Sequence, residues 1–272
     1  MPLADLPGST TGPDAAVVRV LSYNIRSMRD DREALARVIR ACAPDVVCVQ
    51  EAPRFFRWRK AAAWLARETG LVYTTGGATA AGPMILTSLR AHVERAEDTL
   101  LPRVPGLHRR GFATAVLRFG GGHRDAPLRD TGRPENGGGN GVRLGVVSCH
   151  LSLAAAERYE QAGMLLDHLT ALDVPYAIAA GDINDRPDGR AFRRIAGKLR
   201  DGWATEPWGS EATFSPKDPH QRIDGIFASE GIEIIGCGVP AGLPGVTDAD
   251  LRAATDHLPV LAALRLPRVS PA

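Results

Sequence analysis

Short apolar runs, each bounded by polar or turn-forming residues, recur along this chain of 272 residues and predict buried strands. The first run covers residues 17–25, and the second covers residues 45–50. Further strands are predicted at residues 71–75, 84–88, 91–98, 112–119, 142–151, 174–180, 223–228, 232–237 and 258–266. Some of these runs follow one another directly, as the strands of hairpins do, whereas others are separated by longer segments.

Several of the longer segments have helical spacing. Apolar residues at i, i+3, i+4 and i+7 are Leu35, Val38, Ile39 and Cys42. They predict an amphipathic helix that ends at Pro44. The same spacing predicts helices within residues 58–65, 159–169 and 192–199. Because strand–strand neighbours are mixed with strand–helix–strand units, a purely doubly wound sheet is excluded, and the pattern predicts an α/β fold of packed sheets with helices outside.

The chain is predicted to form one domain, residues 17–268, behind a flexible N-terminal arm, residues 1–16. The arm is polar and lacks the basic and apolar regions of a signal peptide. No repeat or interdomain linker interrupts the domain. A glycine-dense stretch, residues 120–141, predicts a loop between two strands. A tolerated surface insertion is the simpler interpretation of this loop, and a substrate-facing lid is the alternative.

The composition indicates the class of protein but does not identify what the protein binds. With 44% apolar and 24% charged residues, the chain has the balance of an ordinary globular protein. Its net charge of +2 favours neither nucleic acid nor a cationic ligand. The four cysteines form no CxxC pair, which disfavours a zinc or redox site. No apolar stretch approaches the roughly 20 residues of a membrane span, so we expect a soluble, cytoplasmic monomer.

Residues that can bind a metal ion or a phosphate follow the apolar runs in six separate segments. They are Asn24, Glu51, His150, Asp182, Asn184, Asp224, Asp256 and His257. Strands that end in these residues could deliver all of them to one rim. Hard oxygen ligands, a carboxylate base and imidazoles are what Mg²⁺-assisted attack of water on a phosphate ester requires. The set therefore predicts a metal-dependent phosphoesterase.

Each residue also has a simpler interpretation. Glu51 follows a buried run, where a charge is costly unless it is paired or bound to metal, yet it could also reach solvent. Asp182 and Asn184 are two apart and would share a face in extended backbone, as a base and an amide donor, or they could form a strand-ending turn. His150 could be structural. For His257, Asp224 and Asp256 are both possible carboxylate partners.

Other kinds of catalytic site are disfavoured. The chain has no G-x-S-x-G motif and no P-loop. Cys149 should point away from His150, since neighbours in a strand face opposite sides. No serine or cysteine nucleophile is therefore predicted.

At this point the blocks Tyr23-Asn24, Gly181-Asp182-Ile183-Asn184 and Thr255-Asp256-His257-Leu258-Pro259 are together distinctive. The chain resembles the endonuclease/exonuclease/phosphatase superfamily, which includes deoxyribonuclease I, and the resemblance covers nearly its whole length. It implies a four-layer α/β sandwich, in which two packed mixed β-sheets are flanked by helices. It also implies a catalytic domain with one active site at the edge of the sandwich and a divalent cation, Mg²⁺, with Mn²⁺ as the alternative.

The resemblance also implies roles for the metal ligands. Glu51 would be the principal ligand, with Asn24 close by, and Asp256 would hold the metal or a nearby water.

The remaining five residues would act on the substrate. Asp182 would activate the attacking water, and Asn184 would bind a phosphoryl oxygen. His257, with Asp224 as its carboxylate partner, would stabilise charge on the phosphate. His150 would be a second imidazole in contact with the phosphate, as in the deoxyribonuclease I-like and phosphatase branches.

Two features leave the substrate open among nucleic acid, inositol phosphate and a phospholipid headgroup. The Tyr or Arg that contacts phosphate in the family cannot be placed, and Arg109 and Arg110 are candidates. Residues 55–58, Phe-Phe-Arg-Trp, could form an apolar, Arg-rich lip, although helix core with a solvated Arg is the preferred interpretation.

The alternative function is a binding or scaffold protein that keeps the fold without activity.

Overall fold

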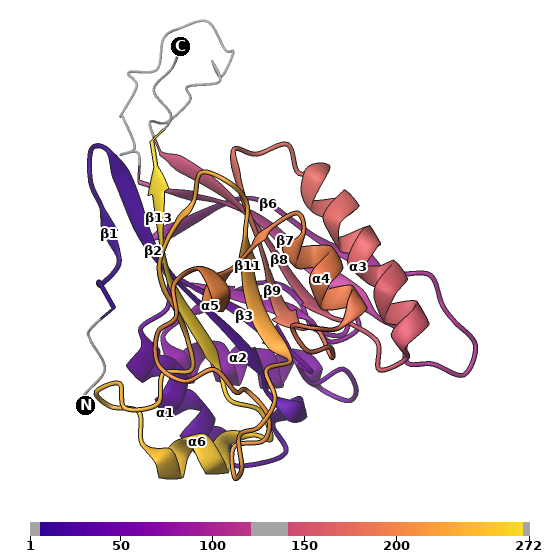
Figure 1. The fold of residues 1–272 in the computed structure, drawn as a ribbon. Helices are drawn as coiled ribbons and strands as arrows, with labels where there is room; N and C mark the ends of the chain where they lie inside the picture. The colour runs from indigo at the N-terminus through magenta and orange to yellow at the C-terminus, as the bar shows by residue number, and fades with distance from the viewer. Residues whose placement is uncertain (1–5, 121–140, 269–272) are drawn as a thin grey trace, which may run out of the picture.

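The computed structural model describes residues 6–120 and 141–268, and it contains two mixed β-sheets packed face to face (Figure 1). The strands of the first sheet are, in spatial order, β12 (Glu233–Gly238), β13 (Val260–Pro267), β2 (Ala15–Asn24), β3 (Val46–Gln50), β5 (Met84–Thr87) and β4 (Val72–Gly76). The strands of the second are β10 (Arg200–Asp201), β11 (Asp224–Ala228), β9 (Tyr176–Asp182), β8 (Val142–His150), β7 (Gly111–Phe119) and β6 (Ala91–Leu100). In each sheet one central pair is parallel, β2–β3 or β8–β9, and its other pairs are antiparallel.

Helices cover the outer face of each sheet. Those on the first sheet are α1 (Arg32–Cys42), α2 (Trp58–Thr69) and α6 (Asp248–Ala254), and those on the second are α3 (Ala155–Thr170) and α4 (Arg190–Ala196). The short helices η1 (Arg26–Met28) and α5 (Gly202–Thr205) complete the described elements. Three apolar cores separate four layers, one under each helical layer and one between the sheets. The predicted four-layer α/β sandwich is therefore confirmed.

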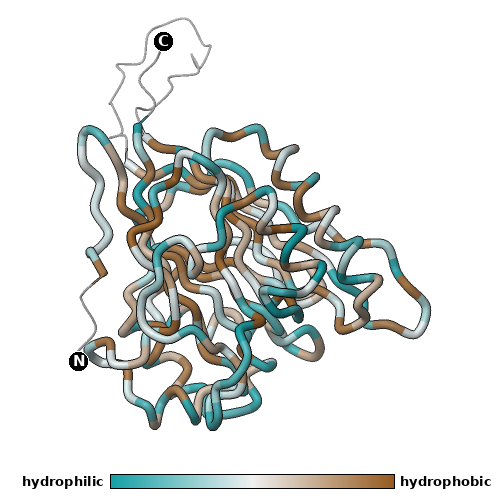
Figure 2. The backbone as a smooth tube through the Cα atoms, viewed as in Figure 1, coloured by the Kyte–Doolittle hydropathy of each residue, from teal (hydrophilic) through white to brown (hydrophobic). Residues whose placement is uncertain are grey.

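Strand alternation assigns each side chain to one of these cores. On β2, Val18 and Val20 pack between the sheets, whereas Leu21 and Tyr23 pack under the helices. The same two-residue period holds on β3, β8, β9, β11 and β13. These strands are apolar on both faces because both faces are covered. In Figure 2 the hydrophobic colour accordingly runs along the central strands, and hydrophilic colour gathers on outer helices and loops.

Local signals fix the first helix as predicted. Asp31 accepts hydrogen bonds from the N–H groups of Glu33 and Ala34, both at 2.9 Å, and so caps α1. The helix ends at Cys42, where Ala43 takes a left-handed conformation ahead of Pro44.

The next helix differs from the preferred interpretation. It begins only at Trp58, so Phe55 and Phe56 precede it and are 82% and 90% exposed. Assigning residues 55–58 to helix core was therefore wrong for the two phenylalanines, because the chain turns after β3 and directs them outward.

Two further segments complete the comparison with the predicted elements. Thr10–Thr11 form strand β1 beside β2, and Leu6 packs into the core under α1, although both lie within the predicted arm. The predicted loop at 120–141 lies almost wholly outside the described residues. Within the described ranges, no helix is long and apolar enough to cross a lipid bilayer.

Candidate active site

The rows of side chains between the two sheets end in polar groups at one edge of the sandwich. Asn24 ends β2, His150 ends β8 and Asp182 ends β9, each in step with the apolar residues that face the other sheet. Asp224 begins β11 and pairs with Asp182 across the antiparallel ladder. The segment before β13 reaches the same edge, because β13 runs antiparallel to β2 and Thr255 Oγ1 donates to Asn24 O at 3.1 Å.

A polar layer supports this edge from inside. Gln50 is fully buried between the sheets, and its Nε2 donates to Cys48 O at 2.9 Å and to Ser148 Oγ at 3.4 Å. Ser22 Oγ donates to Gln50 Oε1 at 3.4 Å. These bonds satisfy the amide where water is excluded, and they join the two sheets directly beneath the polar groups.

Asp182 lies at the centre of the polar group. Its Oδ2 accepts from Asn24 Nδ2 at 3.0 Å and lies 3.4 Å from His150 Nε2 and 3.8 Å from His257 Nε2. Burial raises the pKa of Asp182, although the neighbouring imidazoles and Asn24 oppose that effect. A carboxylate whose pKa is raised in this way is a stronger proton acceptor than an exposed one.

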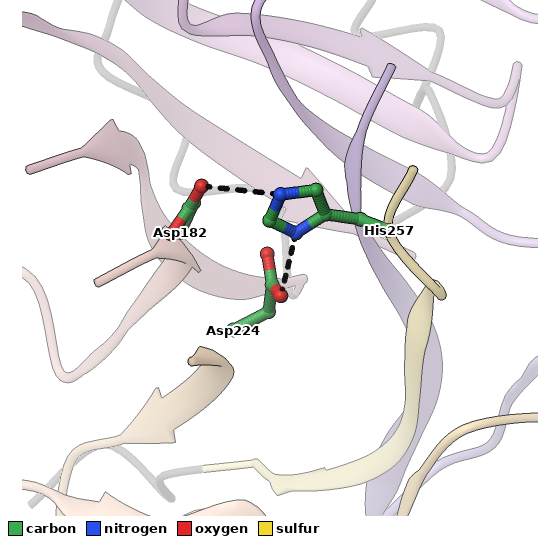
Figure 3. Close-up of side chains that lie close together, drawn as sticks. All are labelled: Asp182, Asp224 and His257. Carbon is green, nitrogen blue, oxygen red and sulfur yellow. Dashed lines mark hydrogen bonds and ion pairs between the residues drawn. The ribbon is translucent and has the colours of Figure 1, made fainter. Parts of the chain in front are cut away.

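The structure selects Asp224 as the partner of His257 (Figure 3). His257 Nδ1 and Asp224 Oδ2 are 2.9 Å apart, and the ring of Phe214 lies 5.1 Å from the imidazole. Asp256 instead forms an ion pair with Arg26 at 3.2 Å, and its side chain is 37% exposed. Burial acts to lower the pKa of His257, but the charge and hydrogen bond of Asp224 outweigh it and raise the pKa to about 10.

The pKa of the second imidazole, that of His150, is shifted in the opposite direction. Burial lowers the pKa of His150 to about 3, and the positive charges of Arg110, His257 and Arg54 add to this effect against the attraction of Asp182. At neutral pH His150 is therefore a neutral imidazole beside Asp182, whereas His257 is an imidazolium.

His150 should make the fold sensitive to acid. In the unfolded chain it takes up a proton near its ordinary pKa of 6.5, but in the folded chain only near 3. The unfolded state therefore binds more protons between these values, and the free energy of unfolding should fall as the pH falls through this window, by at most about 1.4 kcal/mol per pH unit from this residue. Urea unfolding between pH 7 and about 4 measures this slope, which should be shallower in His150→Gln.

Asn184 joins the site by a turn and not by extended strand. Its φ is 54°, its N–H donates to Asp182 Oδ1 at 2.9 Å, and its Nδ2 donates to Leu151 O at 2.9 Å. The prediction that Asp182 and Asn184 share a face of an extended strand was wrong, because β9 ends at Asp182. Asn184 instead fixes the carboxylate of Asp182 from the backbone side.

Glu51 lies next to Asn24, as the metal-site prediction requires. Its backbone is left-handed, with φ 52°, and its Oε1 lies 3.3 Å from Asn24 Nδ2. Asn24 thus bridges the carboxylates of Glu51 and Asp182. Two carboxylates linked through Asn24 at this edge of the sandwich form a donor set that suits a hard divalent cation.

A second group could also hold a metal ion. Ligand atoms of Asp182, Asp224 and His257 all lie within 4.8 Å of one another. A metal bound by His257 there would have to displace one of the two ring N–H protons of the imidazolium. The oxygen-only pair, Glu51 and Asp182, fits Mg²⁺ better, since this cation prefers oxygen ligands.

Two arginines lie beside these carboxylates. Arg110 is 8% exposed, and its Nε has no hydrogen-bond partner among the described residues. Burial lowers its pKa, against the attraction of Asp182 and Glu51. Of the two sequence candidates, Arg110 is therefore the one at the site, whereas Arg109 is exposed. Arg54, which the sequence gave no reason to select, also lies close enough to affect Arg110 and His150.

Comparison with known proteins agrees with this fold. The model of the Endonuclease/Exonuclease/phosphatase family matches residues 21–257. The endonuclease/exonuclease/phosphatase from Bacteroides vulgatus shares 18% identity over 92% of this chain and 99% of its own, with a TM-score of 0.69. A mannosyl-6-phosphatase from Bacteroides thetaiotaomicron shares 18% identity over 91% of this chain and 99% of its own, with a TM-score of 0.68. Truncated TDP2 from Caenorhabditis elegans shares 16% identity over 91% and 97%, with a TM-score of 0.63.

No curated protein is significantly similar to this chain in sequence. The solved structures, at these low identities, establish the fold. The family model covers most of the chain, from within β2 to His257, and so includes the whole polar edge described above. The chain belongs to the endonuclease/exonuclease/phosphatase family and is a phosphoesterase of that family.

Proposed function

We propose that the protein is a Mg²⁺-dependent hydrolase of phosphate esters in which Asp182 directs a water molecule at phosphorus. The observation that carries this proposal is the position of Asp182, whose Oδ2 lies within 4 Å of Asn24, His150 and His257. A buried carboxylate with a raised pKa, at the edge of the sandwich, can orient a water molecule and accept its proton.

The other side chains would handle charge on the phosphoryl group. The imidazolium of His257, held by Asp224, would donate a hydrogen bond to a phosphoryl oxygen as charge develops there. Neutral His150 would donate a second, uncharged hydrogen bond. The guanidinium of Arg110, unpartnered at Nε, would offer a fixed positive charge.

Glu51 and Asn24, with Asp182 beside them, would hold the cation. When bound, Mg²⁺ would stabilise negative charge on the reacting phosphate and the leaving oxygen. Asp256 is less suited to direct ligation because Arg26 already neutralises it at 3.2 Å, so we assign it to the outer edge of the metal site.

Chelation is expected to abolish hydrolysis. With EDTA, turnover of bis(p-nitrophenyl) phosphate or p-nitrophenyl phosphate should fall by about 10²-fold or more, and added Mg²⁺ or Mn²⁺ should restore it. The restored enzyme should then be tested on plasmid DNA, abasic DNA, RNA, inositol phosphates and sphingomyelin. Mannose 6-phosphate belongs in this set, since one structural neighbour is a mannosyl-6-phosphatase. Undiminished turnover in EDTA would contradict the proposal.

A further inference from the structure

Two adjacent phenylalanines project from the rim of the active site. Phe55 and Phe56 are 82% and 90% exposed and lie in the loop between Glu51 and the start of α2. The base of this loop is fixed, because Ala52 N–H donates to Gly82 O at 2.9 Å and Arg54 Nη1 donates to Ala81 O at 3.0 Å. The phenyl rings are thus presented to solvent by an anchored loop.

The residues around this rim are strongly basic. Residues 52–60 and 101–110 contain the basic residues Arg54, Arg57, Arg59, Lys60, Arg103, Arg109 and Arg110. The same two segments contain no acidic residue, although the whole chain has a net charge of only +2. Positive charge is therefore concentrated beside the site, and Arg57 lies against Phe56, with its Cζ 5.7 Å from the ring centroid.

An apolar cavity of about 600 Å³ opens beside the same rim. Its apolar lining includes Leu101, Val104, Leu107 and Met164, and the loop from β6 to β7 passes the first turn of α3 there (Figure 1). The cavity adjoins the site because Leu101 N–H donates to Arg110 O at 3.0 Å.

Other apolar residues extend the surface. Leu153, which lies shortly after His150, is exposed, and Val104 and Leu107 are partly exposed. Aromatic and aliphatic side chains and positive charge thus lie together beside the candidate phosphoesterase site. Glu157 and Glu160 of α3 also line the cavity.

We propose that this rim, formed by residues 52–60, 101–110 and 151–153, binds the surface of an anionic lipid bilayer. Phenyl rings and leucines enter the boundary between headgroups and acyl chains, while arginine and lysine pair with lipid phosphates and carboxylates. Stacking on single-stranded nucleic acid would use the two phenyl rings and the charge. It would leave the aliphatic side chains and the apolar cavity unused, so these features favour lipid.

Co-sedimentation of the full chain with vesicles tests this surface. Binding should be weak to phosphatidylcholine alone and strong to vesicles with about 30% phosphatidylserine, and it should weaken as salt rises. The variant Phe55→Ala/Phe56→Ala should bind the anionic vesicles about tenfold more weakly or worse. Its melting temperature should be unchanged, because both rings are already exposed in the folded protein.

A matched control uses another exposed apolar residue. Leu89 is 89% exposed but follows Thr87, which pairs with Val46 at the end of β3 far from Glu51. Leu89→Ala should bind vesicles like the wild type, and so should Asp182→Asn, since binding does not need hydrolysis. Equal binding by the double phenylalanine variant and the Leu89 variant would overturn the proposal. Loss of oligothymidylate binding in the double variant, without vesicle binding by the wild type, would overturn it in favour of nucleic acid.

Discussion

Replacing Asp182 by asparagine is expected to lower turnover of a phosphate ester by about 10²–10³-fold or more. Asparagine has nearly the same shape, and its one carbonyl oxygen can keep one of the two bonds that Asp182 accepts, from Asn24 at Oδ2 or from the N–H of Asn184 at Oδ1, but it cannot take a proton from water. Because Asp182 is buried and its pKa is raised by that burial, a neutral amide should be tolerated by the fold. Steady-state kinetics at saturating Mg²⁺, with circular dichroism on the same sample, measure both effects.

Asp185 offers a matched control three residues away. Its Oδ2 accepts from Ala191 N–H at 2.9 Å at the start of α4, and its Oδ1 lies 3.5 Å from Arg158. Asp185→Asn should therefore reduce stability by about 1 kcal/mol or less and leave turnover within a few-fold of wild type. If Asp182→Asn retained a comparable turnover, the role of Asp182 as proton acceptor would be wrong.

Much of the fold could be predicted because its signals are local. The strands carry continuous apolar runs, since both faces of each central strand are covered. Helix α1 has an apolar stripe, an N-cap at Asp31 and a stop at Pro44, so all its signals agree. Helix α6 was not predicted: it has seven residues and buries only Leu251 and Ala254, too few to establish a period.

The site needed tertiary information at several positions. The partner of His257 depends on the register in which Asp224 meets Asp182 across β11 and β9. The residues next to Asp224 in sequence do not indicate that register. Asp256, which is adjacent in sequence, is drawn outward by Arg26.

Arg110 and Arg54 pose a related problem. Both lie in polar, Arg-rich loops where a neighbouring arginine is equally plausible from sequence. Only the folded chain shows that Arg110 is buried beside Asp182 while Arg109 is exposed. An arginine in a loop has no periodicity to mark it, which is why residue type and spacing left both candidates open.

The surroundings of the two imidazoles give them different protonation states. His150 and His257 are both buried beside Asp182, yet burial dominates for His150 whereas Asp224 dominates for His257. A neutral imidazole and an imidazolium therefore lie beside the same carboxylate at the same pH. The charge of His257 depends mainly on Asp224, whose carboxylate lies 2.9 Å from Nδ1 and can be neutralised without changing the imidazole.

Asp224→Asn is accordingly expected to lower turnover at pH 8 by about 10²-fold, and the loss should recover on acidification. Asp224 contributes most to raising the pKa of His257 to about 10, with further contributions from Asp182 and Asp256, so without the charge of Asp224 burial should lower this pKa. Wild-type His257 should lose its proton only as the pH rises through about 10, whereas the variant should lose it well below pH 8. A pH–rate profile between about 6 and 10 measures the displacement of this upper limb.

In the same pH–rate profile, His257→Gln separates the effect of the positive charge of His257 from the effect of its hydrogen bond. Glutamine can donate a hydrogen bond but cannot be protonated, so its turnover should be low and should show no recovery at lower pH. Because Asp224 acts through His257, the double variant should be no slower than His257→Gln alone, and the two losses should not add. An Asp224→Asn profile parallel to that of the wild type, merely lowered at every pH, would mean that Asp224 supports the fold of the site and does not set the charge of its imidazole.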